Sequence, residues 1–372
     1  MIARSTTEIG FALRPSDHPA SVTERNRLLA APGFGLVFTD HMVTIRWSAE
    51  RGWHDGQLEP YGPIALEPAT SVFHYGQEIF EGLKAYRQAS GPIVAFRPLE
   101  NAERFRASAV RMAMPELPES AFIRAIELLV TQDRDWVPTA EGNSLYLRPF
   151  MIATYPGLGV SRPSPSYLFT TIASPVGPYF GDGPVRPVSV WLAENYTRAA
   201  VGGTGAAKAG GNYAAGFAGQ LEANHNGCEQ VVWLDATEHR WVEEMGGMNV
   251  FFVFGSGADA RIMTPALTGT LLPGITRDSL LELGPDLGIP ASEGRISIEQ
   301  WRAGCESGDI TEVFACGTAA VITPVGTVKG AAGSWTVGDG SPGPVTMRLR
   351  EQLLGIQFGQ LPDPHGWIHK II

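Results

Sequence analysis

Residues 201–216, VGGTGAAKAGGNYAAG, place a single lysine, Lys208, among glycines and alanines. Few side chains in this segment are large, so the backbone can approach another molecule closely. A lysine buried in such a place loses hydration, and its neutral amine becomes a nucleophile. This suits a lysine that forms a Schiff base with a carbonyl compound. The alternative is a flexible glycine loop whose lysine faces water, and the segment taken by itself favours that alternative.

The same glycines match neither of the two common phosphate-binding loops. A P-loop requires glycine before its lysine and serine or threonine after it, but Ala207 and Ala209 stand there. A dinucleotide-binding loop requires glycine or alanine three residues after Gly205, and Lys208 occupies that position. A nucleotide-binding function is therefore disfavoured.

A second segment, WVEEMGGMNVFFVF at 241–254, places two acids at the edge of a strongly apolar strand. Burying a carboxylate there is costly unless a cation pairs with it. A protonated pyridine nitrogen would be such a cation, and the charged ring would withdraw electrons from a substrate. The alternative is that Glu243 and Glu244 are turn residues that face water.

Several motifs in sequence order resemble the class IV aminotransferases that use pyridoxal 5'-phosphate, and among them the branched-chain amino acid aminotransferases. The segments that carry the resemblance are KAGGNY (208–213), EMGGMN (244–249), IMT (262–264), LLPGITR (271–277), FTDHM (38–42), HYG (74–76), FEGLKAY (80–86) and NAERF (101–105). Together they cover nearly the whole chain after residue 33. The resemblance implies an α+β fold of type IV, with a smaller N-terminal α/β domain and a larger C-terminal domain that has a β-barrel-like core.

The resemblance also implies which residues hold the cofactor. Lys208 would bind it covalently and then act as the base that moves the substrate's Cα proton. Glu244, rather than Glu243, would face the pyridine nitrogen. The remaining cofactor-binding residues would be Tyr213 at the ring hydroxyl and Arg104, Ile275, Thr276 and Thr318 at the phosphate. A guanidinium suits a phosphate because it donates two parallel hydrogen bonds, although Arg104 could instead be a solvated residue on an amphipathic helix.

A pocket for branched-chain substrates needs apolar walls and one polar group that can answer glutamate's side-chain carboxylate. The resemblance implies that Arg148 is that group, and a structural arginine bonded to loop carbonyls is an equal alternative. The implied walls are Phe34, Tyr75, Phe80, Tyr146 and Tyr179, and the implied contacts to the substrate carboxylate are Gly247, Ala319 and Ala320. Gly247 stands where many relatives have threonine, so a backbone contact is expected there. The stretch after CGTAA lacks the CxxC redox pair of some relatives.

The pattern of strands and helices predicts two domains. Residues 1–33 are predicted to be an extended arm, 34–173 an N-terminal α/β domain, 174–187 a linker rich in proline and glycine, and 188–372 a C-terminal cofactor-binding domain. Helices are expected over 101–112, with Asn101 as the N-cap, and over 120–130, 213–225, 277–287 and 345–357. Strands are expected over 36–47, 93–97, 145–153, 167–173, 188–193, 229–235, 248–255 and 311–325.

Composition limits the partners and the compartment. The chain has 372 residues and a formal net charge of −10, with no basic block, so nucleic acid and anionic membranes are not expected partners. Its three cysteines are far apart, which argues against a disulfide framework or a structural metal site. The first residues lack the apolar core of a secretory signal, so a cytoplasmic location is expected.

We therefore expect a homodimeric enzyme that transfers an amino group between leucine, isoleucine or valine and 2-oxoglutarate. Within the same fold, a D-amino acid aminotransferase and an aminodeoxychorismate lyase are the alternatives. A small-molecule binder that keeps the scaffold without catalysis is an alternative of another class.

Overall fold

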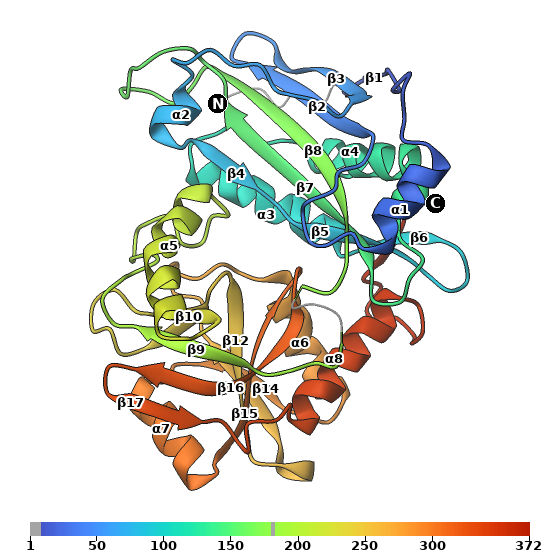
Figure 1. The fold of residues 1–372 in the computed structure, drawn as a ribbon. Coiled ribbons are helices and arrows are strands. Elements are labelled where there is room, and N and C mark those ends of the chain that lie inside the picture. The colour runs from blue at the N-terminus through green and yellow to red at the C-terminus, as the bar shows by residue number, and fades with distance from the viewer. Residues whose placement is uncertain (1–8, 180–182) are drawn as a thin grey trace. The chain divides into compact units, whose positions relative to one another are not determined.

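The computed structural model describes residues 9–179 and 183–372, which form two compact units. The first unit consists of the described residues of Met1–Asp182 together with Ala207–Gly210 and Ile356–Ile372. The second consists of Gly183–Ala206 and Gly211–Gly355. Figure 1 labels their elements. Among the helices of the described ranges, none combines the length and the apolar character that a membrane span requires.

The described part of the first unit is built on one sheet of nine strands, ordered β1-β3-β2-β8-β7-β5-β6-β18, with β4 paired to β7. The first pair, β1 and β3, is parallel, and the other pairs are antiparallel. The strands are β1 (Phe11–Leu13), β2 (His41–Ser48), β3 (Gly52–Pro60), β4 (Glu78–Phe80), β5 (Leu83–Arg87), β6 (Ile93–Phe96), β7 (Ser144–Ala153), β8 (Ser166–Val176) and β18 (Ile368–Lys370).

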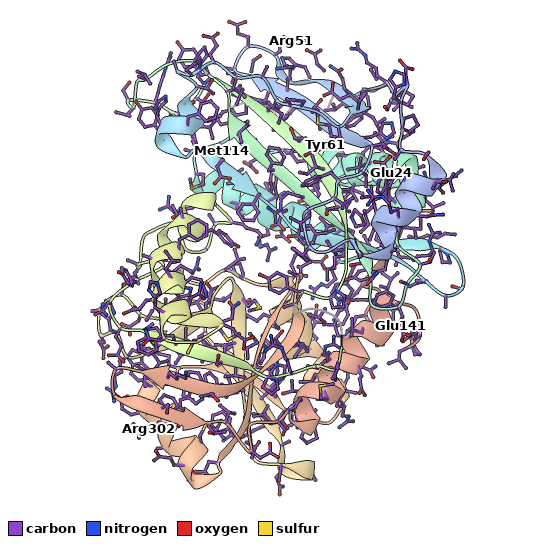
Figure 2. All side chains as sticks on the ribbon, viewed as in Figure 1. Glu24, Arg51, Tyr61, Met114, Glu141 and Arg302 are labelled. Atoms are coloured by element: carbon purple, nitrogen blue, oxygen red, sulfur yellow. The ribbon has the colours of Figure 1, made fainter. Side chains whose placement is uncertain are left out.

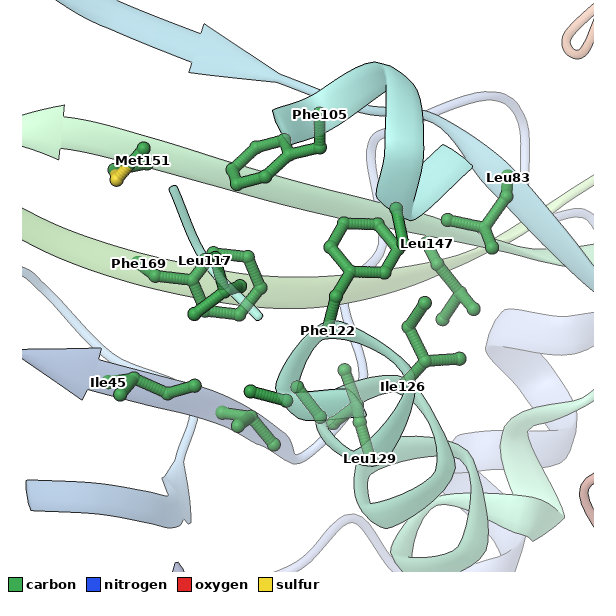
Figure 3. Packing of buried hydrophobic residues seen from close by; sticks show 14 of the residues in the cluster. Ile45, Leu83, Phe105, Leu117, Phe122, Ile126, Leu129, Leu147, Met151 and Phe169 are labelled. Atoms are coloured by element: carbon green, nitrogen blue, oxygen red, sulfur yellow. The ribbon is translucent and has the colours of Figure 1, made fainter. Parts of the chain in front are cut away.

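Helices α3 (Pro98–Arg111) and α4 (Glu119–Gln132) pack together, and α4 lies on β2 and β8. Their apolar faces meet the sheet in one hydrophobic core, where Phe105, Phe122 and Phe169 contact one another (Figure 3). Each of these rings is almost fully buried, which stabilises the unit by about 1.5–3 kcal/mol per side chain. The other helical segments of this unit are α1 (Val22–Ala30), α2 (Ser71–Tyr75) and the 3-10 turn η1 (Arg134–Trp136).

The second unit contains a closed barrel. Among its described strands, β11-β10-β9-β16-β15-β12 form the ring, which closes through the β11–β12 pair. The pairs of β9 with β10 and β16 are parallel, and the other four are antiparallel. The strands are β9 (Val188–Ala193), β10 (Gln230–Leu234), β11 (Val242–Met245), β12 (Met248–Phe254), β15 (Ile310–Gly317) and β16 (Val321–Gly330), extended by β13 (Arg261–Pro265), β14 (Ala291–Gly294) and β17 (Gly333–Thr336).

The helical segments that belong wholly or mainly to the second unit are α5 (Gly210–His225), η2 (Gly257–Asp259), α6 (Ile275–Asp286), α7 (Ile298–Ser307) and α8 (Pro344–Gln357). Helix α7 begins at a capping box, in which Ser297 and Gln300 bond each other's backbone N–H groups. The outer face of α7 is charged, and Arg302 projects from it beside Glu306 (Figure 2).

The five predicted helices are confirmed, as is the two-domain α+β class with a barrel. The expected N-cap at Asn101 is wrong, because α3 begins at Pro98 after Arg97 in the left-handed region, and Asn101 is buried within the helix. The predicted strand 311–325 is two strands, β15 and β16, separated by a turn at residues 318–320. Helix α7 was not predicted, although the spacing of Ser297 and Gln300 is a capping signal.

The described part of the N-terminal arm is not simply extended. Strand β1 pairs with β3, and α1 follows Ser21, whose hydroxyl accepts the N–H of Glu24. Strand β8 continues to Val176, into the range predicted as the linker. The C-terminal residues also return to the first unit, since β18 pairs with β6. With this segment included, the first unit is the larger of the two rather than the smaller, contrary to expectation.

Candidate active site

The first unit holds the lysine segment between β4 and α3. The N–H of Lys208 donates to the hydroxyl of Ser108 at 3.0 Å, and its carbonyl accepts the N–H of Phe80 at 2.9 Å. Two residues later, the N–H of Gly210 donates to the carboxylate of Glu78. The lysine amine lies 5.0 Å from the centre of the Phe80 ring, and the side chain is half-buried. The segment is therefore anchored on both sides rather than a loose glycine loop.

Glu78 itself is half-buried, and burial raises its pKa, although the Gly210 N–H and the charge of Arg148 oppose that effect. The lysine segment thus rests on a carboxyl group that loses its charge more easily than an exposed glutamate does. Ser108, at the other side, is 1% exposed.

Arg104 is buried against a carboxylate on α3's inner face. Its Nε and Nη2 donate to the two oxygens of Glu81 at 2.7 and 2.8 Å, and Asn101 Nδ2 donates to Glu81 Oε2 at 2.7 Å. Glu81 is 0% exposed. Burial raises the pKa of Glu81, but the charges of Arg104 and Lys208 and these hydrogen bonds outweigh it, so the pKa lies below its ordinary value. Arg104 is therefore not the solvated helix residue of the alternative interpretation.

Four of the five predicted wall residues gather around Arg148 in the first unit. The Phe34 ring lies 5.4 Å from that of Tyr146 and 5.0 Å from that of Tyr179, measured between ring centres. The Arg148 guanidinium lies 4.8 Å from the Phe80 ring centre and donates to the Tyr146 hydroxyl at 3.1 Å. Its Nε is buried and has no hydrogen-bond partner among the described residues. A buried donor without a partner is rare and is typical of a site that receives a ligand.

Glycine is required next to this group. A Cβ on Gly82 would overlap the Tyr146 hydroxyl, so the FEG motif needs a residue without a side chain beside the aromatic wall. Tyr75, the fifth predicted wall residue, lies apart on α2. Its ring is 43% exposed, and its hydroxyl donates to the carbonyl of Leu158.

In the second unit, Glu244 is buried on β11 and fully engaged. Its Oε2 pairs with Arg198 Nη2 at 2.5 Å, and its Oε1 accepts the N–H of Leu272 at 2.8 Å and Asn249 Nδ2 at 3.3 Å. Adjacent residues of a strand point to opposite faces, and Glu243 instead accepts the Thr270 hydroxyl at 2.5 Å. Burial raises the pKa of Glu243. Both acids are buried, so the interpretation that they are turn residues facing water is wrong.

The predicted phosphate residues of this unit lie at two chain turns near Asn249. Ile275 and Thr276 begin α6 after Gly274, where no side chain caps the helix, and first-turn N–H groups form a natural anion site. Asn249 Nδ2 donates to the Leu272 carbonyl just before this helix at 3.0 Å.

The second turn follows β15 and contains the predicted residues Thr318, Ala319 and Ala320, all half-buried. Asn249 is the register partner of Glu244 on one side and of Cys316 on the other. This turn therefore begins about 10 Å from Glu244, two strand spacings across the barrel.

Tyr213 lies in the first turn of α5, half-buried, and next to Gly247 in the β11–β12 turn. A Cβ on Gly247 would lie 3.3 Å from the Tyr213 ring. A larger residue at 247 would therefore press on the tyrosine unless the ring moved, which gives the absence of the relatives' threonine a local reason.

Several residues of these clusters were not predicted. They are Glu78, Glu81, Asn101 and Ser108 in the first unit and Arg198 and Asn249 in the second. A polar residue inside an otherwise apolar strand, such as Asn249 in MNVFFVF, is a signal of a buried hydrogen-bond network. Nothing in the local pattern identifies Arg198 as the partner of Glu244, because that pair joins residues far apart in the chain.

Comparison with known proteins matches these residues to one family. The family model described as Amino-transferase class IV matches residues 78–328. The branched-chain-amino-acid aminotransferase of Mycolicibacterium smegmatis is 58% identical over 97% of this chain and 98% of its own. That of Mycobacterium tuberculosis (strain H37Rv) is 56% identical over the same shares.

Solved structures agree with the sequence comparison. A branched-chain amino acid aminotransferase from the organism abbreviated T.th., solved with pyridoxamine 5'-phosphate, has a TM-score of 0.72 and 29% identity, covering 88% of this chain and 98% of its own. The Escherichia coli enzyme has a TM-score of 0.69 and 29% identity, covering 88% and 99%. With its anchored lysine, buried carboxylate and barrel, the chain belongs to the class IV aminotransferases.

Proposed function

We propose that the chain is a branched-chain amino acid aminotransferase, which transfers the amino group between L-leucine, L-isoleucine or L-valine and 2-oxoglutarate and uses pyridoxal 5'-phosphate. The observation that carries this proposal is the 58% identity over 97% of the chain to an aminotransferase of that name. The residues of both units support it, because each chemical part of the cofactor and of the substrates has a matching group.

The residue types fit the cofactor part by part. The first unit offers a half-buried amine at Lys208 and a buried guanidinium at Arg104 for a phosphate. The second offers the Glu244 carboxylate for a ring nitrogen, the Tyr213 phenol for a ring hydroxyl and the uncapped start of α6 for a phosphate. When bound, the cofactor supplies a sink for the electrons of the substrate's Cα–H bond.

The protein's own groups then hold and move the protons. In our proposal, the amine of Lys208 binds the cofactor, is released when the substrate amine replaces it, and removes the proton from the substrate's Cα. Glu244 holds a proton on the ring nitrogen. Its bonds to Arg198, Leu272 and Asn249 fix the carboxylate in one orientation, so little reorganisation is needed during the reaction.

Substrate choice is assigned to the aromatic group around Arg148. Phe34, Phe80, Tyr146 and Tyr179 offer apolar surface to a branched side chain, while the partnerless Nε of Arg148 supports recognition of glutamate's side-chain carboxylate. One pocket would then accept both substrates in turn, as a ping-pong reaction requires. Tyr75 is proposed to serve the site of a second subunit, and the backbone of Gly247, Ala319 and Ala320 to contact the substrate carboxylate.

Steady-state rates with three amino donors test the proposal. We expect rapid turnover of L-leucine with 2-oxoglutarate and little turnover of D-alanine or aminodeoxychorismate. Negligible turnover of L-leucine would contradict the assignment, and dominant turnover of either other compound would move the chain to a different activity within the family.

We also propose a homodimer in the cytoplasm. Five exposed apolar side chains form a patch on α2 and the following loop, here called the α2 patch: Phe73, Tyr75, Tyr155, Leu158 and Val160. The bonds from Ser71 to Tyr155 and from Tyr75 to Leu158 hold the two segments together. Contiguous exposed apolar surface supports a protein–protein interface. The three free cysteines support a reducing compartment.

A further inference from the structure

Two parallel links connect β4 and its continuation to α3, and they hold two different functional groups. In one, Phe80 and Ser108 bind the main chain of Lys208 from its two sides. In the other, Glu81 and Arg104 form a bidentate ion pair. Phe80 and Glu81 are adjacent, while Arg104 and Ser108 are four residues apart and so lie on one face of the helix. The position of the arginine relative to the lysine is thereby fixed within the first unit.

The Glu81–Arg104 pair is an unusual choice for a purely structural contact. Glu81 is 0% exposed and Arg104 9%, and an ion pair this dry is often no more stabilising than apolar side chains of the same size. The neighbouring positions on α3, Phe105 and Ala109, show that this face of the helix packs with apolar residues. An apolar pair would therefore meet the needs of the fold alone.

The geometry of the pair fixes the direction in which the guanidinium points. Glu81 binds the edge formed by Nε and Nη2, and because the group is planar, the edge formed by Nη1 and Nη2 is directed away from Glu81. Asn101 and the N–H of Gly82 bind Glu81 Oε2 and keep the carboxylate from rotating. The arginine is thus held in a single orientation.

We propose that Glu81 is a positioning residue, which holds the Arg104 guanidinium in the orientation that receives the cofactor phosphate. This rests on the proposed role of Arg104. Without Glu81, the guanidinium would have to be ordered at the moment of binding, and that ordering would be subtracted from the affinity. Glu81 also provides a negative charge between two cationic side chains before the phosphate arrives, since both Arg104 and Lys208 stabilise its charged form.

The test measures binding rather than activity. Apoprotein is titrated with pyridoxal 5'-phosphate and, separately, with inorganic phosphate, for the wild type and for Glu81→Gln, which keeps the shape but removes the charge. We expect Kd to rise about ten-fold or more for both probes, a range familiar from the hydrogen-bonded partners of metal ligands. Unchanged or tighter binding by Glu81→Gln would overturn the proposal.

Two further variants separate positioning from general destabilisation. Glu312→Gln is the matched control, because Glu312 is also buried and accepts three hydrogen bonds, from Val345 and Thr346 at the start of α8. It should lower Tm and leave both Kd values unchanged. If Glu81→Gln does not fold, Asn101→Ala replaces it, since it removes one bond to Glu81 and keeps the ion pair. A smaller rise in both Kd values is expected, and no rise would contradict the proposal.

Arg104→Lys distinguishes failure of this proposal from failure of the assigned phosphate role. If Arg104→Lys leaves the affinity for pyridoxal 5'-phosphate unchanged, Arg104 is not the phosphate residue. If it weakens binding while Glu81→Gln does not, only the positioning role is wrong. When Glu81 acts through Arg104, adding Glu81→Gln to Arg104→Lys causes little further loss, and fully additive losses would contradict it.

Discussion

Glu243 and Glu244 show how one strand assigns two adjacent acids to different environments. Glu244 is held by a cation and two N–H donors, whereas Glu243 bonds a threonine hydroxyl. Burial raises the pKa of Glu243, so its neutral form is more accessible than that of an exposed glutamate. Alternation of side chains along the strand is what separates the two, and a shift by one residue would exchange their surroundings.

This difference predicts the outcome of two isosteric substitutions. Glu244→Gln should lower kcat by about two orders of magnitude, because an amide cannot stabilise a proton on the ring nitrogen by charge. Glu243→Gln is the matched control, also buried and one residue away, and should leave kcat nearly unchanged. Steady-state kinetics at saturating cofactor measure both. A large loss in Glu243→Gln with little loss in Glu244→Gln would reverse the two assignments.

The individual groups of the site could be predicted, but their supports could not. Lys208, Glu244 and Arg104 stand in short segments whose residue types and order carry the family resemblance. Glu81 and Arg198 become important only when the chain brings them to Arg104 and Glu244, and no local pattern encodes those pairs. Buried polar partners of this kind are a property of tertiary structure.

Helices with a clear apolar period, such as α3, α4 and α6, could be predicted within a few residues of their ends. Their starts were harder, because capping depends on a backbone conformation that the side chains do not announce. Helix α3 begins after Arg97 in the left-handed region rather than at the asparagine that the composition suggests. The predicted strand 311–325 missed a turn, because its residues Thr318, Ala319 and Ala320 are compatible with a strand as well.

The turn between β10 and β11 is held by one carboxylate, and its stability should depend on pH. Asp235 accepts four backbone N–H groups, from Thr237, Glu238, Arg240 and Trp241. Burial would raise its pKa, but these bonds outweigh that effect and hold the pKa at about 2, against an ordinary value of 3.8. Because the folded value is the lower one, the stabilisation is complete above about pH 4 and is lost as the pH falls through about 2.

Asp235→Asn should therefore lower the free energy of unfolding at pH 7 by about 1 kcal/mol, after allowance for partial exposure. Urea denaturation followed by circular dichroism measures this, and the difference from wild type should shrink steadily between about pH 4 and about pH 2. Glu238→Gln, an exposed carboxyl in the same turn, is the control and should have no such effect. A constant difference at all pH values would show that the Asp235 charge does not contribute.

At the scale of the whole molecule, the order of residues along the chain does not follow the division into units. The lysine segment Ala207–Gly210 belongs to the first unit although its neighbours on both sides belong to the second, and the C-terminal residues return to the first. Composition could indicate a boundary near the proline- and glycine-rich stretch after Val176. It could not indicate these returns, because they depend on strand pairing and contacts over long separations in sequence.

The α2 patch predicts the oligomeric state. Replacing Phe73 and Leu158 together by serine should convert a dimer into a monomer, since both side chains are 62% exposed and would be buried in a subunit interface. Light scattering after size-exclusion chromatography measures the mass. Leu99→Ser is the control, because Leu99 is an exposed apolar residue of the same unit outside the patch. A dimer that persists in the double variant would place the interface elsewhere.

The central claim is that one particular amine of this chain carries the cofactor. The chain contains only four lysines, Lys84, Lys208, Lys329 and Lys370, so the carrier can be identified without ambiguity. Protein purified with pyridoxal 5'-phosphate is reduced with borohydride, digested, and its peptides are weighed by mass spectrometry. The account predicts a pyridoxyl group on the peptide that contains Lys208 and on no other. A label on Lys84, Lys329 or Lys370, or an unlabelled Lys208 peptide in a protein that turns over L-leucine, would contradict it.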